Sequence, residues 1–354
     1  MMIRQYFRMF AVVVGIAALL GVVPARAVDP AFTVTDLGTL GGDRSSAYGI
    51  NNRGVVVGIS TTPDGATRGF IYEEGMLSEI ATFGGRDSFA YSISDIGTAT
   101  GRAQDARGDF RAFVVSRLTP LIDLTALDPA FEAPFSTGTG MNARGDAVGY
   151  RQRNSDHMAA QTRGFLFSDS VLIDLGTFGG EDAVLTAVND LGQLVGFYST
   201  ESHADYANRR AFIVQQGGTA EDIGTMGGQL TTPTAINNQG RVVGFAQLRG
   251  GESRAFVYES GQLSALGVLP GGRQSFAYGI NQPGDAVGAS EAADGSLHAT
   301  LYKAGQVIDL NTVIPAGSGW RLTEARGINA SGVIVGTGVF QGRQRAFKLT
   351  PVDQ

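Results

Sequence analysis

Residues 47–58 read Ala47-Tyr48-Gly49-Ile50-Asn51-Asn52-Arg53-Gly54-Val55-Val56-Val57-Gly58, and the chain contains seven versions of this stretch. The other versions centre on Ser92-Ile93-Ser94, Gly140-Met141-Asn142, Ala187-Val188-Asn189, Ala235-Ile236-Asn237, Gly279-Ile280-Asn281 and Gly327-Ile328-Asn329. The polar residue that closes each triplet lies at position 51, 94, 142, 189, 237, 281 or 329, so the copies are 43 to 48 residues apart. A fixed period of this length predicts a repeat architecture in which each copy is one supersecondary unit.

Each repeat contains four short β signals. Examples are a small-x-small-aliphatic-Asn strand at 277–281, an aliphatic strand ending in Gly at 241–244, an Arg-Ala-Phe strand at 254–258 and an Asp-Leu strand at 171–175. Four antiparallel strands in about 45 residues match one propeller blade, and the 3.6-residue period of a helical solenoid is absent. We therefore predict an all-β fold, a seven-bladed β-propeller of four-stranded antiparallel blades.

The third and fourth strands of a repeat carry complementary charges. A hairpin between them would place a cationic residue opposite an acid in five repeats, with the pairs Arg68–Glu79, Arg111–Asp123, Arg163–Asp174, Arg210–Asp222 and His298–Asp309. Such cross-strand pairs contribute about 0.2–1 kcal/mol each and mainly specify register. The fifth repeat departs from the rule, because Arg254 would face Ala265.

The two ends of the repeat array complement each other. The last repeat ends after its third strand at 345–349, and the segment 32–37 is a lone fourth strand. We expect this N-terminal strand to complete the last blade, with Asp36 facing Arg345 and Val34 facing Phe347. Such closure would cover both exposed sheet edges.

Residues 1–27 have the pattern of a secretory signal peptide. Arg4 and Arg8 precede an apolar run at 11–23, and Ala25-Arg26-Ala27 is a small-x-small cleavage site. The apolar run is short for a membrane span of about 20 residues. We predict cleavage after Ala27, a single propeller domain over 28–354, export to the periplasm or extracellular space, and no membrane span in the mature chain.

The composition narrows the class of partner. The chain has 354 residues, 51 glycines, no cysteine and a net charge of −6. A mildly acidic protein is a poor partner for nucleic acid, which favours clustered Lys and Arg. Without cysteine an exported chain depends on core burial rather than disulfides. We expect a monomer that binds no nucleic acid.

The third strand carries a resemblance to a known family. Arg-Ala-Phe occurs at 111–113, 210–212, 254–256 and 345–347, and Arg-Gly-Phe at 68–70 and 163–165. Together with the Gly-Ile-Asn-Asn-x-Gly elements, this resembles the HAF-repeat family of extracellular bacterial proteins, named for a His-Ala-Phe triplet. The resemblance covers about residues 32–349, although Arg mostly replaces the eponymous His. It implies export and a repeat fold, and no reaction.

The longest variable loops supply candidate ligand groups. They lie at 150–162 and 197–209, in adjacent repeats, on the face where propellers usually bind ligands. The candidate ligand-binding residues are Arg153, Asp156, His157, His203, Asp205, Tyr206 and Trp320. The alternatives are that these loops are merely solvated, and that Trp320 plugs the base of its blade rather than stacking on a ligand ring.

Other chemistries find little support in the sequence. His157 and His203 lack the short ligand spacings of zinc sites. The arginine row could form a ring for an anionic polymer, but its acidic partners argue for internal neutralisation. No nucleophile elbow or nucleophile–base constellation is recognisable. We therefore predict no catalytic residue, no metal site and no cofactor.

These observations favour a secreted, non-catalytic binding or scaffold module. Its ligand, a glycan or another extracellular protein, would lie on the loop face of the third and fourth blades. The alternative is a secreted polysaccharide-acting enzyme, a hydrolase or lyase, on the same propeller scaffold. A purely structural surface repeat would differ from the first hypothesis only in lacking a ligand.

Overall fold

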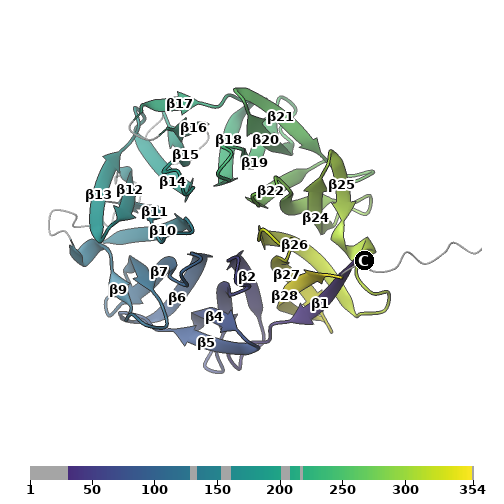
Figure 1. Ribbon diagram of the computed structural model, residues 1–354, viewed down its shortest axis with the longest axis horizontal. Coiled ribbons are helices and arrows are strands. Elements are labelled where there is room, and N and C mark those ends of the chain that lie inside the picture. Colours follow the sequence, from purple (N-terminus) through teal and green to yellow (C-terminus); the bar gives the residue numbers. More distant parts are fainter. Residues whose placement is uncertain (1–30, 128–133, 153–160, 201–207, 216–217, 353–354) are drawn as a thin grey trace, which may run out of the picture.

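The computed structural model describes residues 31–127, 134–152, 161–200, 208–215 and 218–352. These residues form antiparallel β-sheets, with short 3-10 helices at η1 (Thr125–Leu127) and η3 (Leu310–Thr312). Figure 1 shows the sheets arranged radially, with the first strand of each repeat innermost. The fold is all-β, as predicted.

Among the described residues, five sheets have four strands each. The first two are β2 (Ser45–Ile50), β3 (Val56–Thr61), β4 (Thr67–Glu73) and β5 (Met76–Ile80), then β6 (Gly84–Ile93), β7 (Ala99–Asp105), β8 (Phe110–Val115) and β9 (Ile122–Asp123). The third is β10 (Phe135–Met141), β11 (Ala147–Gln152), β12 (Thr162–Ser168) and β13 (Val171–Gly176). The other two are β22 (Ser275–Ile280), β23 (Ala286–Glu291), β24 (Leu297–Lys303) and β25 (Gln306–Asp309), then β26 (Trp320–Ile328), β27 (Ile334–Phe340), β28 (Arg343–Pro351) and β1 (Phe32–Asp36).

The remaining strands of the described chain form one eight-stranded sheet. It consists of β14 (Asp182–Val188), β15 (Leu194–Ser199), β16 (Arg209–Val214), β17 (Ala220–Asp222), β18 (Gly227–Ile236), β19 (Val242–Leu248), β20 (Ser253–Glu259) and β21 (Gln262–Gly267). Its two four-stranded halves are joined by a single parallel bridge between Arg209 and Leu230. Each half therefore has the strand order of the other sheets.

The N-terminal strand β1 pairs antiparallel with β28, the third strand of the last repeat. The predicted register is wrong by two residues, because Asp36 lies opposite Phe347 and Val34 opposite Leu349. Asp36 Oδ2 still lies 3.8 Å from Arg345 Nε, since the long guanidinium side chain reaches its acid diagonally.

The same two-residue error affects the predicted hairpins. Glu79 lies opposite Phe70 rather than Arg68. The reason is the turn: Glu73 pairs with Met76, so only Glu74 and Gly75 form the loop, with φ of 52° and 84°. A two-residue turn with positive φ at both positions sets the register of a hairpin. The other acids are displaced in the same way, in the pairs Phe113–Asp123, Phe165–Asp174, Phe212–Asp222 and Thr300–Asp309.

Most of the predicted charge pairs nevertheless form across the diagonal. Arg68 Nε lies 2.7 Å from Glu79 Oε1, and Arg163 Nε lies 3.0 Å from Asp174 Oδ2. Arg210 also pairs with Asp222. Arg111 forms an ion pair with Asp105 at 3.0 Å.

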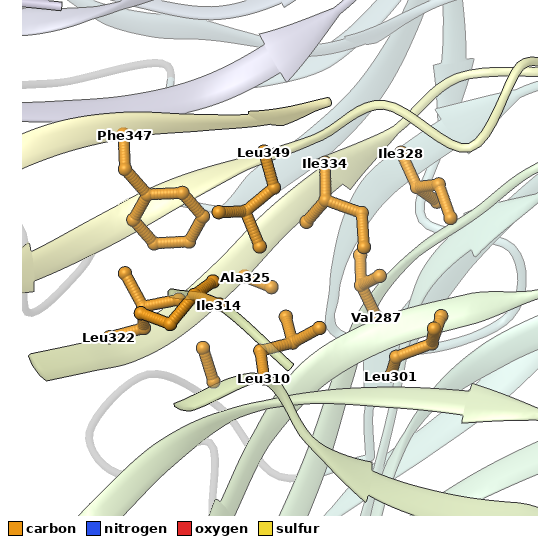
Figure 2. Packing of buried hydrophobic residues seen from close by; sticks show 11 residues of the cluster. Val287, Leu301, Leu310, Ile314, Leu322, Ala325, Ile328, Ile334, Phe347 and Leu349 are labelled. Atoms are coloured by element: carbon orange, nitrogen blue, oxygen red, sulfur yellow. The ribbon is translucent and has the colours of Figure 1, made fainter. Parts of the chain in front are cut away.

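The core lies within and between the sheets. The third-strand phenylalanines are fully buried at Phe70, Phe113, Phe165, Phe212, Phe256 and Phe347. A second-strand glycine leaves room for the ring of Phe70: a Cβ on Gly58 would lie 2.0 Å from the Ser46 carbonyl oxygen and 2.8 Å from Cζ of Phe70. Figure 2 shows how Val287 and Leu301 of one sheet pack with Ile328 and Phe347 of the next.

Candidate functional site: the axial hollows

Every first strand carries a β-bulge at the same position of the repeat. In β2 the pairing shifts between Ala47 and Gly49, so Tyr48 is the extra residue. The corresponding extra residues are Tyr91, Thr139, Thr186, Thr234, Tyr278 and Arg326. A bulge leaves its extra residue unpaired and re-aims its side chain. All seven of these residues line one hollow at the centre of the ring.

The residue after each bulge is small because neighbouring first strands approach closely at the centre. A Cβ on Gly140 would lie 2.6 Å from the carbonyl oxygen of Thr186, on the first strand of the next repeat. Thr139 Oγ1 donates to the Leu185 carbonyl oxygen at 2.7 Å and so ties the same two strands together. The small residues therefore let neighbouring first strands approach closely, while the bulge residues project toward the axis.

The first axial hollow has a volume of about 540 Å³, within the range of about 300–1,000 Å³ of small-molecule sites. Its wall is asymmetric. Three threonines project from adjacent repeats on one side, and Tyr91, Tyr48, Arg326 and Tyr278 project from adjacent repeats on the other. The rings of Tyr48 and Tyr91 meet edge to face at 5.6 Å. The asymmetry means that the hollow could orient a ligand with one aromatic or apolar side.

Arg102 projects into this hollow from β7. Its guanidinium carbon lies 4.7 Å from the ring centre of Phe89, 4.4 Å from that of Phe110 and 5.8 Å from that of Phe135. Its Nε is buried and has no hydrogen-bond partner in the described part of the chain. Burial raises the pKa of the neighbouring Tyr91 to about 12, against the opposing effect of the Arg102 charge. The Tyr91 hydroxyl is therefore protonated at neutral pH.

Arg326 is the second cation in the hollow, and it is already neutralised. Its Nη2 lies 2.6 Å from Glu324 Oε2. Its guanidinium carbon lies 4.1 Å above the ring of Tyr278, whose pKa burial raises to about 12 although the Arg326 charge opposes the shift. The pair Arg326–Glu324 therefore adds no net charge to the site.

A second hollow, of about 410 Å³, lies beyond the first and has mostly polar walls. Seven aliphatic side chains line both hollows and form a waist between them: Ile50, Ile93, Met141, Val188, Ile236, Ile280 and Ile328. Each is the aliphatic residue of the repeated triplet. A strictly periodic position thus becomes a ring of apolar side chains.

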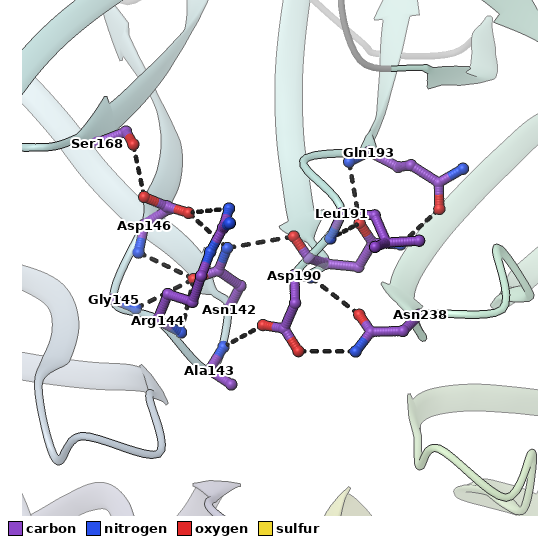
Figure 3. A network of polar contacts seen from close by, with 11 residues as sticks. Asn142, Ala143, Arg144, Gly145, Asp146, Ser168, Asp190, Leu191, Gln193 and Asn238 are labelled. Carbon is purple, nitrogen blue, oxygen red and sulfur yellow. Dashed lines mark hydrogen bonds and ion pairs between the residues drawn. The ribbon is translucent and has the colours of Figure 1, made fainter.

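Asparagines of the triplets link neighbouring repeats around the second hollow. In five of these links, the Nδ2 group of one asparagine donates to the backbone oxygen of the asparagine in the next repeat, at 2.9–3.2 Å. The donor–acceptor pairs are Asn142–Asn189, Asn189–Asn237, Asn237–Asn281, Asn281–Asn329 and Asn329–Asn51. Asn51 donates likewise to the Ser94 oxygen at 2.9 Å. Figure 3 shows a further link, in which Asp190 accepts from the Ala143 amide and from Asn238 Nδ2.

A Ser-His-Asp arrangement lies in β24 and its flanks, although none was recognisable in the sequence. Ser296 Oγ lies 3.1 Å from His298 Nε2, and His298 Nδ1 lies 2.7 Å from Asp309 Oδ2. Ser296 Oγ also donates to Asp294 Oδ1 at 2.7 Å. His298 stands where the other repeats have the arginine of the Arg–acid pair. The sequence predicted His298 and Asp309 as a cross-strand charge pair, and it gave no signal that Ser296 would lie beside the imidazole.

Six of the predicted ligand-binding residues lie outside the described residues: Arg153, Asp156, His157, His203, Asp205 and Tyr206. Trp320 is described. Its ring stacks on Phe340 at 4.8 Å and meets Phe347 edge to face at 6.1 Å. This is the packing expected of a plug at the base of the last sheet, and ligand contact by Trp320 stays a prediction.

Sequence reasoning also missed the axial residues. The signal was present, because the second position of the motif small-x-small-aliphatic-Asn is always Tyr, Thr or Arg, whereas the position after it is always Gly, Ala or Ser. In a regular strand this position would be unremarkable, and only the bulge directs it to the axis. Within the described ranges, no group of three or more His, Cys, Asp or Glu side chains could hold a metal ion, and no helix is long and apolar enough to cross a membrane.

The fold and the axial hollows define a β-propeller protein. Its structure is similar to the propeller domain of the Trilobed protease from Pyrococcus furiosus, with a TM-score of 0.54 and 13% identity over 87% of this chain and 93% of that one. It is also similar to Pyrococcus horikoshii acylaminoacyl peptidase, with a TM-score of 0.56 and 13% identity over 91% of this chain and 53% of that one. A third similar structure is a puromycin-hydrolyzing peptidase of Mycobacterium tuberculosis, with a TM-score of 0.52 and 12% identity over 93% and 56% of the two chains.

The chain thus spans about half the length of the two peptidases. No protein-family model and no curated protein matches it. At 12–13% identity the likeness is one of fold. A fold hosts many functions, so activity has to be argued from the site.

These comparisons correct the predicted function. The non-catalytic binding or scaffold module, and its alternative of a polysaccharide-acting enzyme, are contradicted because the similar propellers belong to peptidases. The expectation that the chain is not an enzyme is contradicted for the same reason. The prediction rested on the two long loops as a site for a glycan or a protein, and the axial hollows are not apparent from the sequence.

Proposed function

We propose that this chain is a β-propeller that works in peptide hydrolysis, with its axial hollows receiving a segment of the polypeptide substrate. The observation that carries the proposal is the aliphatic waist between two hollows with different walls. The likeness in fold to peptidase propellers over about nine tenths of the chain supports the choice of substrate class.

The proposal includes a closed ring of seven blades, completed by β1. Two features support it. Asn329 of the last repeat donates a hydrogen bond to the backbone oxygen of Asn51 in the first repeat, and β1 supplies the fourth strand of the last sheet. A closed ring matters for the function because it would hold the seven waist residues at a constant separation. An open ring would let the hollows widen.

The chemistry of the hollows suits an extended polypeptide. The apolar waist can contact side chains without demanding one particular residue, while the tyrosine hydroxyls of the first hollow offer hydrogen bonds to peptide groups. Backbone amides leave water at little cost when polar partners replace it. We therefore expect moderate affinity and little sequence selectivity for peptides lying along the axis.

A second candidate function is favoured by Ser296, His298 and Asp309, namely that this chain itself performs the acyl transfer. Ser296 Oγ would attack the peptide carbonyl carbon while His298 Nε2 takes its proton and then delivers it to the leaving amine. Asp309 would accept a hydrogen bond from His298 Nδ1–H, and water would then hydrolyse the acyl-serine. The bond from Ser296 to Asp294 competes with this proton path.

The test combines binding and turnover by the purified protein. Fluorescent unstructured peptides are titrated for binding, and fluorogenic peptides are assayed for cleavage. Thr186→Trp would fill the axial hollow and is expected to abolish peptide binding. Leu118→Trp is the matched control, because Leu118 is 96% exposed and remote from the lining of the hollows.

The outcomes separate the candidates. Binding that Thr186→Trp removes and Leu118→Trp leaves intact supports the axial site, and unaltered binding in Thr186→Trp refutes it. Cleavage that Ser296→Ala abolishes supports the second candidate. Cleavage that survives in Ser296→Ala removes the serine from consideration.

We also propose that the protein is exported and belongs with the HAF-repeat proteins, on the strength of the leader pattern and the repeated motifs. Mass spectrometry of the protein recovered from the periplasm or medium is expected to give a chain that begins at Val28. Recovery of a chain that retains residues 1–27 in the cytoplasm would contradict export.

A further inference from the structure

Arg102 interrupts the repeat pattern in the second strand. The residue after the second-strand glycine is Ile59, Tyr150, Phe197, Phe245, Ala289 or Thr337 in the other repeats, and Arg102 alone is charged. The repeat fold therefore does not require a cation here. The three rings around the guanidinium hold it in place.

The charge of Arg102 has no carboxylate partner within the described ranges, in contrast to Arg326, which pairs with Glu324. A confined guanidinium costs free energy unless an anion and hydrogen bonds compensate it. Its planar fork matches a carboxylate, which can accept two parallel hydrogen bonds. The hollow thus presents one cation that has aromatic neighbours but no carboxylate partner among the described residues.

Two buried hydroxyl groups of the same hollow also lack partners among the described residues. Thr137 is 4% exposed and Thr232 is 7% exposed, both line the hollow, and neither Oγ1 has a hydrogen-bond partner. Buried hydroxyls are normally satisfied, and an orphan needs an explanation. Thr137 and Arg102 line the same hollow from adjacent strands, since a Cβ on Gly138 would lie 3.3 Å from the backbone nitrogen of Gly101.

We infer that the first axial hollow binds a carboxylate group attached to an aromatic moiety, with Arg102 and Thr137 on the carboxylate and Tyr48 and Tyr91 against the ring. Thr232 completes the polar side of the site. In a protein of the proposed function, on which this choice of ligand rests, that group is the C-terminal aromatic residue of a peptide with a free carboxylate. The site then distinguishes a peptide end from an internal segment.

The test uses N-acetyl-L-phenylalanine and its uncharged amide as matched probes in isothermal titration calorimetry. The acid is expected to bind at least about tenfold more tightly than the amide, as befits a charge-assisted hydrogen bond. Arg102→Gln is expected to lose this difference, and Thr137→Val to weaken binding of the acid several-fold. Arg273→Gln removes the same charge at a side chain that is 73% exposed and should leave both affinities unchanged.

Equal affinity for acid and amide, undetectable binding of the acid, or unchanged selectivity in Arg102→Gln would each overturn the inference. Urea denaturation of every variant shows whether the fold is retained. A peptide ending in phenylalanine, as free acid and as amide, separates the two proposals. If both forms of the peptide bind equally, the proposed function survives and the carboxylate site fails. If N-acetylphenylalanine binds but neither form of the peptide does, the carboxylate site survives and the proposed function fails.

Discussion

Substitutions at the asparagines that link neighbouring repeats can separate two contributions to stability: the hydrogen bond between repeats and the hydrogen bonds within a turn. Asn281 donates from Nδ2 to the Asn329 oxygen at 3.2 Å, and its Oδ1 accepts from the amides of Gly284 and Asp285 at 3.0 and 2.8 Å. Ser94 occupies the same position in the second repeat, where its Oγ accepts from the Thr98 amide at 3.0 Å. Serine therefore keeps the bond within the turn and lacks the bond between repeats.

The magnitudes follow from what each variant leaves unpaired. Asn281→Ser loses the side-chain bonds to the Asn329 oxygen and from the Gly284 amide. The Gly284 amide still donates to the Asn281 carbonyl at 3.1 Å and the Asn329 oxygen still accepts from the Gly332 amide at 3.0 Å, so we expect a loss of about 1 kcal/mol in the free energy of unfolding. Asn281→Ala also strips the Asp285 amide of its side-chain acceptor and should cost about 2–4 kcal/mol in total. Ser94→Asn should add a bond and stabilise the protein by about 0.5–1.5 kcal/mol.

The measurement is equilibrium urea denaturation, followed by far-UV circular dichroism and by the fluorescence of Trp320, the single tryptophan. Asn329→Ser is the variant that examines ring closure, because its lost bond joins the last repeat to the first at 3.2 Å. It should cost as much as Asn281→Ser. If Asn281→Ser and Asn281→Ala lowered the free energy of unfolding equally, the two kinds of hydrogen bond would not contribute separately. If Asn329→Ser left the free energy of unfolding unchanged, the proposed closure of the ring between the last and first repeats would be refuted.

Three further predictions concern the core, the edge and the charges. Phe256→Ala should destabilise the protein by about 3–5 kcal/mol, measured by thermal denaturation, because the ring is fully buried and its cavity cannot close; a loss below 1 kcal/mol would show a plastic core. Deletion of residues 28–40 should cause aggregation in size-exclusion chromatography, since it exposes the edge of β28; a monodisperse, equally stable product would contradict the closure by β1. Burial alone would raise the pKa of Asp146, but hydrogen bonds from Ser168 and Asn142 and the Arg144 charge outweigh it and hold the pKa below its usual range. The folded-state pKa is thus lowered, so this stabilisation is present above the unfolded pKa of about 3.9 and is lost as the pH falls below it. In urea midpoints measured from pH 2 to 7, Asp146→Asn should be less stable than wild type at pH 7 and should converge with it under acid conditions; a constant gap would show that the charge of Asp146 is irrelevant.

The register of the hairpins shows where reasoning from sequence failed. The charge pattern correctly indicates that Arg68 and Glu79 interact, but the prediction that they lie directly opposite each other is wrong. The two-residue turn at Glu74-Gly75 decides the register of this hairpin. Long side chains tolerate a diagonal pair, so charge complementarity alone leaves an ambiguity of two residues.

The sequence by itself determined the four-stranded repeat, the glycines of the turns, the buried phenylalanines and the partnership between the N-terminal strand and the last repeat. These features are local or recur in every copy, so one repeat confirms the next. The axial hollows were decided by tertiary structure. Tyr48, Arg102 and Thr137 belong to different strands, and only the bulges and the radial arrangement bring them to one axis. The charge pattern predicted the pair of His298 with Asp309, whereas the approach of Ser296 to His298 depends on the geometry of the turn before β24.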